Sequence, residues 1–186
     1  MDQPAETLAC DLVTLRRFRP EDVDELDRVI VESLEHLKPW MPWAHTHSLD
    51  AARDYLDRAE REWGSGEAYN YAITTGGAIL GSCSLMRRIG PGGLEIGYWI
   101  RPERTGRGLV TMAAAALTRQ AFELPGTTHV EIHHDPANTA SGAIPRRLGY
   151  AVVPPGPTGP PGPEASAEQT PSVVRRLDRV EDLRLR

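Results

Sequence analysis

The chain has 186 residues, of which 40% are hydrophobic and 25% charged, and this composition excludes an intrinsically disordered protein. Its formal net charge is −5 and Lys38 is its only lysine, so a nucleic-acid partner is not expected, because such partners are bound by clustered basic side chains. The first ten residues lack the basic and apolar regions of a signal peptide, and no apolar run is long enough to cross a membrane. We expect a single cytoplasmic domain that spans residues 1–186.

The first third of the chain is predicted to form a strand and two helices. Residues 12–18 alternate well enough for a strand. Apolar residues then recur at three- and four-residue intervals over residues 20–38, which predicts an amphipathic helix that ends at Pro39. Ser48 is placed to cap a second helix that runs to about Trp63.

The middle of the chain is predicted to hold three strands and a helix. Residues 69–89 are typical of a hairpin, whose turn contains two glycines that tolerate positive φ. A glycine-rich loop leads to a third strand over residues 94–100. An alanine-rich helix follows from residue 109 to about residue 124.

The last third alternates short strands with one helix. We expect a strand over residues 129–134, a helix from near Asn138 to Arg147, and strands near residues 150–153 and 172–180. Residues 154–171 are rich in proline, which lacks the donor that a sheet requires, so they form a loop within the domain. The final six residues are expected to be a frayed tail. This order predicts a mixed α/β sheet.

The segment RPERTGRGLV, residues 101–110, joins a strand to the alanine-rich helix. A helix N-terminus leaves four amides unpaired and attracts anions, and Gly106 and Gly108 let the backbone approach one closely. Arg104 and Arg107 add donors that suit phosphate. Neither the dinucleotide fingerprint nor the Walker pattern matches these spacings. The segment indicates a different phosphate site or, alternatively, a helix start merely tightened by glycine.

Two stretches together resemble the signature of the GNAT N-acetyltransferases. EIGYWIRPERTGRGLVTMAAAALTRQAF, residues 95–122, resembles the family's strand, Gly-x-Gly turn and helix. NTASGAIPRRLGY, residues 138–150, resembles its second cofactor motif, and the two occur in the family's order and spacing. LKPWMPWA, residues 37–44, and GYWI, residues 97–100, resemble the RimJ/RimL-like branch of ribosomal-protein alanine acetyltransferases.

The resemblance implies a GNAT fold, a mixed and mostly antiparallel sheet flanked by helices, with acetyl-CoA between two splayed central strands. Backbone amides of the glycine turn would bind the pyrophosphate, and an amide near the end of the preceding strand would stabilise the thioester oxygen. Asn138 would bond the pantetheine arm, a role compatible with capping the helix, and Ser141 would face the sulfur. Arg146 would reach a phosphate, although a solvated helix end explains Arg146 equally well. The cofactor-binding residues expected are Trp99, Ile100, Arg101, Arg104, Thr105, Gly106, Arg107, Gly108, Leu109, Asn138, Ser141 and Arg146.

Three positions depart from the family's pattern. Thr105 replaces a Gln or Arg before the turn, and Val110 replaces a small residue after it. Neither change removes a main-chain donor. Pro145 stands where many relatives place a tyrosine that protonates the departing thiolate, so this role passes to another group or to water.

Acetyl transfer to an amine also requires a group that accepts the amine's proton. Glu95 is the first candidate, acting through water, although a structural ion pair would explain a strand carboxylate as well. Glu131 and His133 share one face of the next strand and form a second candidate pair, and Ser141 completes the catalytic candidates. Because His133 and His134 point to opposite faces, we predict no metal site. Cys10 and Cys83 are expected to be reduced thiols.

The acceptor is the least defined part of the prediction. Trp40, Met41 and Trp43 either pack in the core or, if the branch resemblance holds, line the acceptor site. We expect a monomeric or homodimeric enzyme that acetylates a primary amine, first of all a protein or peptide N-terminus. A small-molecule amine, such as a polyamine, an aminoglycoside or an amino-acid-like compound, is one alternative. A non-catalytic acyl-CoA sensor, favoured by the three departures, is another.

Overall fold

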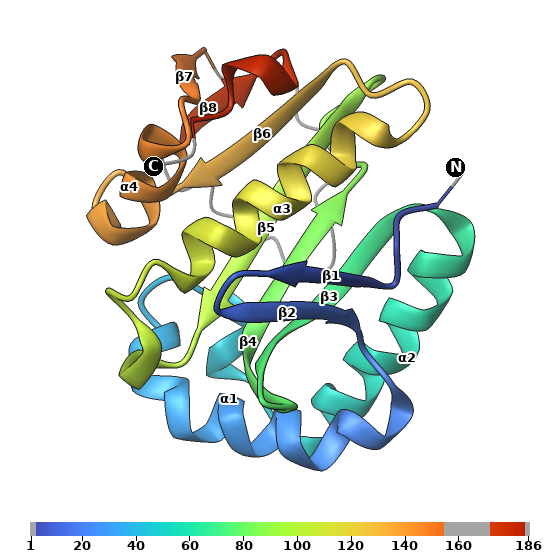
Figure 1. The fold of residues 1–186 in the computed structure, drawn as a ribbon. Helices are drawn as coiled ribbons and strands as arrows, with labels where there is room; N and C mark the ends of the chain where they lie inside the picture. Colours follow the sequence, from blue (N-terminus) through green and yellow to red (C-terminus); the bar gives the residue numbers. More distant parts are fainter. Residues whose placement is uncertain (1–2, 155–171, 185–186) are drawn as a thin grey trace.

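The computed structural model describes residues 3–154 and 172–184, which form one mixed sheet with helices on both faces (Figure 1). The strand order is β1-β2-β3-β4-β5-β6-β8-β7, and every neighbouring pair is antiparallel except β5 and β6. The mostly antiparallel mixed sheet expected from the sequence is therefore confirmed. The strands are β1 (Thr7–Cys10), β2 (Val13–Arg17), β3 (Ala68–Thr75), β4 (Ala78–Met86), β5 (Gly93–Ile100), β6 (His129–His134), β7 (Ala151–Val153) and β8 (Val173–Leu177).

The helices divide between the two faces of the sheet. In Figure 1, α3 crosses the front of the sheet while α1 and α2 lie behind it. Leu94 and Ile96 of β5 pack with the buried alanines of α3, whereas Trp99 packs with apolar side chains from α1 and α2. The helices are α1 (Val23–Leu37), α2 (Leu49–Ser65), α3 (Leu109–Glu123) and α4 (Thr139–Arg147), with short 3-10 turns η1 (Pro20–Asp22), η2 (Pro42–His45), η3 (Pro102–Arg104) and η4 (Val180–Asp182).

Local sequence signals place most of these elements. The Ser48 hydroxyl accepts the Ala51 amide at 3.1 Å and caps α2, as predicted. Gly76 and Gly77, with φ of 58° and 87°, form the predicted turn between β3 and β4. The closely packed small residues of α3 let that helix approach the sheet.

Two parts of the chain differ from the sequence prediction. β1 was not predicted, because an edge strand with only exposed and half-buried side chains carries no strong alternation. The expected frayed tail is wrong for its described part: η4 is formed there, and the Arg184 amide donates to the Leu148 carbonyl oxygen at 3.0 Å. A backbone bond to a distant element leaves no local signal in the sequence.

Two further expectations concern the proline-rich segment and membrane spans. The proline-rich loop predicted over residues 154–171 lies outside the described residues, apart from Pro154. None of the helices in the described ranges is both long and apolar enough to span a bilayer.

β5 and β6 separate soon after they meet. Their pairing joins only Gly93–Glu95 with His129–Glu131, although β5 continues to Ile100 and β6 to His134. A gap between two central strands results, and the splayed strands expected from the sequence are present. α3 begins just beyond the end of β5, and α4 follows β6.

Candidate active site

The turn between β5 and α3 holds two glycines in the left-handed region of backbone conformation. Gly106 has a φ of 71° and Gly108 a φ of 75°, values that residues with a Cβ rarely adopt. A Cβ at either position would meet no atom beyond its chain neighbours within 4 Å, so conformation, and not crowding, favours glycine. Arg104 and Arg107 beside them are exposed and form no ion pair with any described residue.

The amides of this turn are partly engaged already. Those of Arg104 and Thr105 donate to the carbonyl oxygens of Arg101 and Pro102, at 3.0 and 3.2 Å. α3 begins at Leu109, so its first amides have no helical acceptor, and no side chain within the described ranges caps this end. The unpaired amide donors are therefore those of residues 106–111, a range shifted by two residues from the predicted 104–109.

The end of β5 presents alternate amides to the gap. The Arg101 amide donates to the carbonyl oxygen of Leu80, near the start of the neighbouring strand β4, at 2.8 Å. Amides alternate in direction along a strand, so those of Tyr98 and Ile100 point away from β4 and toward the gap. The oxyanion donor expected between Trp99 and Arg101 is thus not the Arg101 amide, which is already bonded; Ile100 has the suitable orientation.

The first turn of α4 lies across the gap from β5. Asn138 caps the helix, since its Oδ1 accepts the Ser141 amide at 3.0 Å. The Tyr98 hydroxyl reaches from β5, donates to the Ser141 carbonyl oxygen at 3.0 Å and accepts from the Ser141 hydroxyl at 3.3 Å. Burial raises the pKa of Tyr98 to about 12, so this hydroxyl stays neutral at physiological pH. Arg146 is exposed in the last turn of α4.

Glu95 lies on the other face of β5, where it is buried in an ion pair. Both of its oxygens accept from Arg88, whose Nε lies 2.9 Å from Oε2 and whose Nη2 lies 2.6 Å from Oε1. Only 7% of the Glu95 side chain is exposed, against 40% for Arg88. The sequence left open whether Glu95 is a base or a structural partner, and this geometry engages both of its oxygens with Arg88.

Glu131 and His133 form a hydrogen-bonded pair beside Glu95. His133 Nε2 lies 2.7 Å from Glu131 Oε2, and Arg176 Nε donates to Glu131 Oε1 at 2.8 Å. Burial raises the pKa of Glu131, but the bonds from His133 and Arg176 outweigh it and hold the pKa below its usual range. In the tautomer that donates from His133 Nε2 to Glu131, the imidazole ring has a lone pair on Nδ1. This atom lies 3.9 Å from Glu95 Oε2, beyond direct hydrogen-bond distance.

Aromatic side chains border the same face of β5. The Trp43 ring lies 6.1 Å from the Trp99 ring and 6.5 Å from the His47 ring. His47 Nε2 lies 2.9 Å from Asp27 Oδ1 of α1, which anchors the segment that carries Trp43. Of the three residues predicted to line an acceptor site, Trp43 alone has a ring contact with β5. Trp40 is 37% exposed and Met41 is half-buried.

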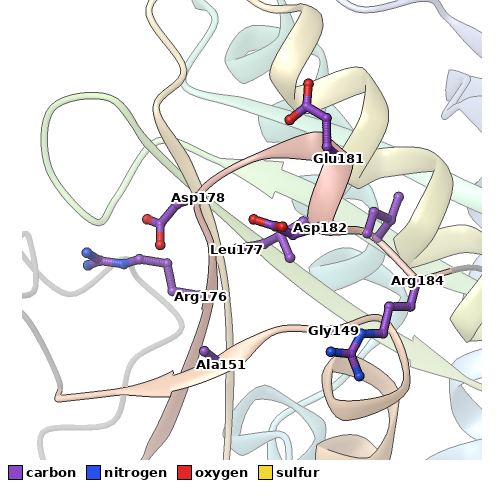
Figure 2. Close-up of a pocket in the computed structure, with 9 residues that line it drawn as sticks. Gly149, Ala151, Arg176, Leu177, Asp178, Glu181, Asp182 and Arg184 are labelled. Atoms are coloured by element: carbon purple, nitrogen blue, oxygen red, sulfur yellow. The ribbon is translucent and has the colours of Figure 1, made fainter.

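A separate hollow of about 380 Å³ lies between β7, β8 and η4. Figure 2 shows Asp178 and Asp182 within it, with Arg176 and Arg184 at its sides. Its wall includes Gly149, where an added Cβ would lie 2.7 Å from the Asp182 carbonyl oxygen. None of the site residues predicted from the sequence lines this hollow, and Arg176, which donates to Glu131, is the side chain that it shares with the candidate site.

Sequence reasoning missed three side chains of this arrangement. Arg88 and Arg176 pair with carboxylates that are distant in sequence or lie across strands, and nothing in the local pattern announces them. Tyr98 was not among the predicted site residues, although Pro145 gave an indirect signal, because a helical proline leaves the carbonyl four residues earlier without its usual amide donor. The described residues contain no group of three or more His, Cys, Asp or Glu side chains that could hold a metal ion.

Comparison with known sequences gives two matches. The family described as Acetyltransferase (GNAT) domain matches residues 13–151. YdaF of Bacillus subtilis (strain 168), a candidate ribosomal N-acetyltransferase by its name, is 30% identical over 144 residues, which cover 74% of this chain and 77% of YdaF.

Solved structures share the fold. A RimL ribosomal L7/L12 alpha-N-protein acetyltransferase in complex with coenzyme A superposes with a TM-score of 0.80 at 19% identity, covering 94% of this chain and 99% of RimL. RimJ of Mycobacterium smegmatis, in complex with CoA-disulfide, has a TM-score of 0.78 at 21% identity and covers 97% of this chain and 89% of RimJ. These likenesses confirm the GNAT fold that the sequence motifs implied.

Proposed function

Because this chain belongs to the GNAT acetyltransferase family, we propose that it acetylates the N-terminal amine of a protein or peptide, with ribosomal proteins as the first acceptors to test. Membership of the family makes it an acetyl-CoA-dependent acetyltransferase with CoA as a product, as the sequence motifs implied. YdaF, a candidate ribosomal N-acetyltransferase by its name, supports the resemblance to the ribosomal-protein branch, and RimL and RimJ share the fold of this chain. The acceptor and the catalytic residues are the proposed part.

One juxtaposition carries the proposal. The turn of unpaired amides over residues 106–111 and the Glu131–His133 pair lie near opposite ends of the same gap between β5 and β6. The turn suits the pyrophosphate of the cofactor, because its helix amides and the exposed Arg104 and Arg107 have no competing partner among the described residues and can bind an anion. The Thr105 hydroxyl donates to the Pro102 carbonyl oxygen at 2.8 Å, so this departure from the family's pattern leaves those amides accessible.

Bound acetyl-CoA supplies a thioester whose carbonyl carbon the amine attacks, forming a C–N bond as the C–S bond breaks. The Ile100 amide stabilises the oxygen of that carbonyl. His133 Nδ1 takes the proton that the amine loses, and Glu131 fixes the orientation of the ring. The Ser141 hydroxyl donates to the leaving sulfur. Glu95, engaged by Arg88, contributes a second negative charge beside His133.

The carboxylates near the gap do not by themselves select an acceptor. Glu95 and Glu131 are direct partners in the register of β5 and β6, and Arg88 and Arg176 balance their charges. The cluster can therefore serve a primary amine of either class. N-terminal amines and small-molecule amines share this chemistry, so acceptor selection rests on the wall that includes Trp43.

The test combines acetyl-CoA binding by calorimetry with thiol release in the presence of an amine panel. The panel contains peptides with the N-terminal sequences of ribosomal proteins, the same peptides with blocked N-termini, a polyamine and an aminoglycoside. We expect turnover with free peptides and none with blocked ones. Turnover with the small amines alone would replace the acceptor assignment, whereas cofactor binding without any turnover would identify a sensor.

A further inference from the structure

The first turn of α4 contains a carbonyl group that its own helix cannot bond in the usual way. In a regular α-helix, the amide of residue 145 would donate to the carbonyl oxygen of Ser141. Proline has no amide hydrogen, so Pro145 cannot make this bond. Pro145 is buried, and Ser141 is only half-buried beside the gap.

A side chain from the opposite wall of the gap donates to that same oxygen. The Tyr98 hydroxyl lies 3.0 Å from the Ser141 carbonyl oxygen. Tyr98 lies on β5 beyond the last residue paired with β6, so no β6 partner separates it from α4. The bond replaces the one that Pro145 abolishes and joins the two walls of the gap.

The same contact leaves the Ser141 side chain adjustable. The Ser141 hydroxyl donates to the Tyr98 oxygen at 3.3 Å, a long and therefore weak bond. A serine hydroxyl can rotate toward another acceptor without moving its backbone. The backbone of Ser141 is held at both ends, because its amide donates to Asn138 Oδ1 at 3.0 Å.

From these contacts we propose that Tyr98 is a positioning residue for acetyl transfer, which holds the Ser141 backbone in place of the helical bond that Pro145 removes. The inference rests on the proposed role of Ser141 as the donor to the leaving sulfur. Tyr98 acts through Ser141 and is not itself the proton donor. Tyr98 and Pro145 are therefore coupled, so the effect of substituting one of them on kcat depends on whether the other is present.

A double-mutant cycle tests this coupling with four proteins: the unmodified chain, Tyr98→Phe, Pro145→Ala and the combined variant. Tyr98→Phe removes only the hydroxyl, and Pro145→Ala restores an amide four residues after Ser141. We expect Tyr98→Phe alone to lower kcat roughly tenfold, the factor that one lost hydrogen bond can account for. The KM for acetyl-CoA should change by less than about threefold, because the pyrophosphate turn is untouched.

In the Pro145→Ala background the same change should cost less than about threefold, since the alanine amide bonds the Ser141 carbonyl. Equal losses in the two backgrounds would overturn the proposal. So would a coupling that is seen in the melting temperature but not in kcat at a temperature well below melting. The pH profile of kcat should keep its shape in Tyr98→Phe; loss of one limb would make Tyr98 a proton donor and not a positioning residue.

Hydrogen exchange measured without cofactor gives a second readout that is independent of activity. Amides of residues 139–147 should exchange roughly tenfold faster in Tyr98→Phe, but not in the combined variant relative to Pro145→Ala. Unchanged exchange in Tyr98→Phe would contradict the contact itself. Failure of the unmodified chain to bind acetyl-CoA in calorimetry would instead refute the proposed function, and the exchange cycle would still report on Tyr98.

Discussion

The two ends of the gap between β5 and β6 differ in the groups that they present, backbone amides at one end and side chains at the other. At one end, the turn before α3 offers backbone amides, and its side chains matter mainly through what glycine permits. At the other end, Glu95, Glu131 and His133 form a cluster of side chains held by Arg88 and Arg176. A backbone site depends on local conformation and a side-chain site on distant partners, so the two should respond differently to substitution.

The largest expected effect is at the backbone end. Gly108→Trp places a large side chain on a left-handed backbone in front of the turn's amides, and we expect acetyl-CoA to bind at least about 300-fold more weakly by calorimetry. Gly64→Ala is the matched control, because Gly64 is in α2 without positive φ and an added Cβ meets nothing within 4 Å. Similar affinity in both variants would remove the turn from the cofactor site.

The next effect shows whether His133 or Glu95 accepts the proton of the amine. We expect His133→Gln to lower kcat about 100-fold, because general-base catalysis accounts for a factor of that order, with little change in acetyl-CoA affinity. Glu95→Gln should lower kcat about tenfold, since its ion pair with Arg88 leaves it a supporting role. A larger loss in Glu95→Gln than in His133→Gln would restore Glu95 as the base.

The acceptor wall is expected to show a smaller and more selective effect. Trp43→Ala should raise the KM for the amine about tenfold while the KM for acetyl-CoA stays the same, because its ring packs on Trp99 at the acceptor face. Trp40→Ala should have a smaller effect on the same constant, since Trp40 is more exposed and has no ring contact among the described residues. Steady-state kinetics with the best peptide acceptor gives both KM values. An equal rise in the KM for the amine in the two variants would mean that Trp40 and Trp43 contribute equally to the acceptor site.

The smallest effect is on stability and depends on pH. The pKa of Glu131 is lower in the folded chain than in the unfolded chain, so its ionised form stabilises the fold above the ordinary glutamate pKa, and this contribution is lost as the pH falls through the lowered value. Glu131→Gln should reduce the free energy of unfolding by about 1–2 kcal/mol at pH 7, since its partners are partly exposed. Urea titrations should show that the difference in the free energy of unfolding between the two proteins becomes smaller below pH 4.5. A difference in unfolding free energy that does not depend on pH would contradict the ion-pair account.

The contrast between the two ends also explains what the sequence could predict. Gly106, Gly108 and the alanines of α3 follow local rules for turns and helices, so the glycine turn and the start of α3 were predicted to within a few residues. Which amides are free was not predictable, because the acceptor for Arg101 lies near the end of β4 and those for Arg104 and Thr105 depend on a 3-10 turn. The partners Arg88 and Arg176 required the register of three strands, which a single sequence does not determine.

Tyr98 is an intermediate case. Pro145 in a helix leaves the Ser141 carbonyl without its usual amide donor, and any nearby hydroxyl could donate to that carbonyl instead. Only the separation of β5 from β6 brings Tyr98 to that carbonyl. The departure at Pro145 thus indicates which carbonyl lacks a donor, that of Ser141, and the fold determines that Tyr98 is the residue that donates to it.

The short parallel pairing of β5 and β6 has a mechanical consequence. Three residue pairs join these strands, against six between β4 and β5 and five between β6 and β8. Among the central strands, β5 and β6 share the fewest pairs, so a substitution that tilts β1–β5 against β6–β8 should change the width of the gap between them before it changes the spacing of the strands on either side.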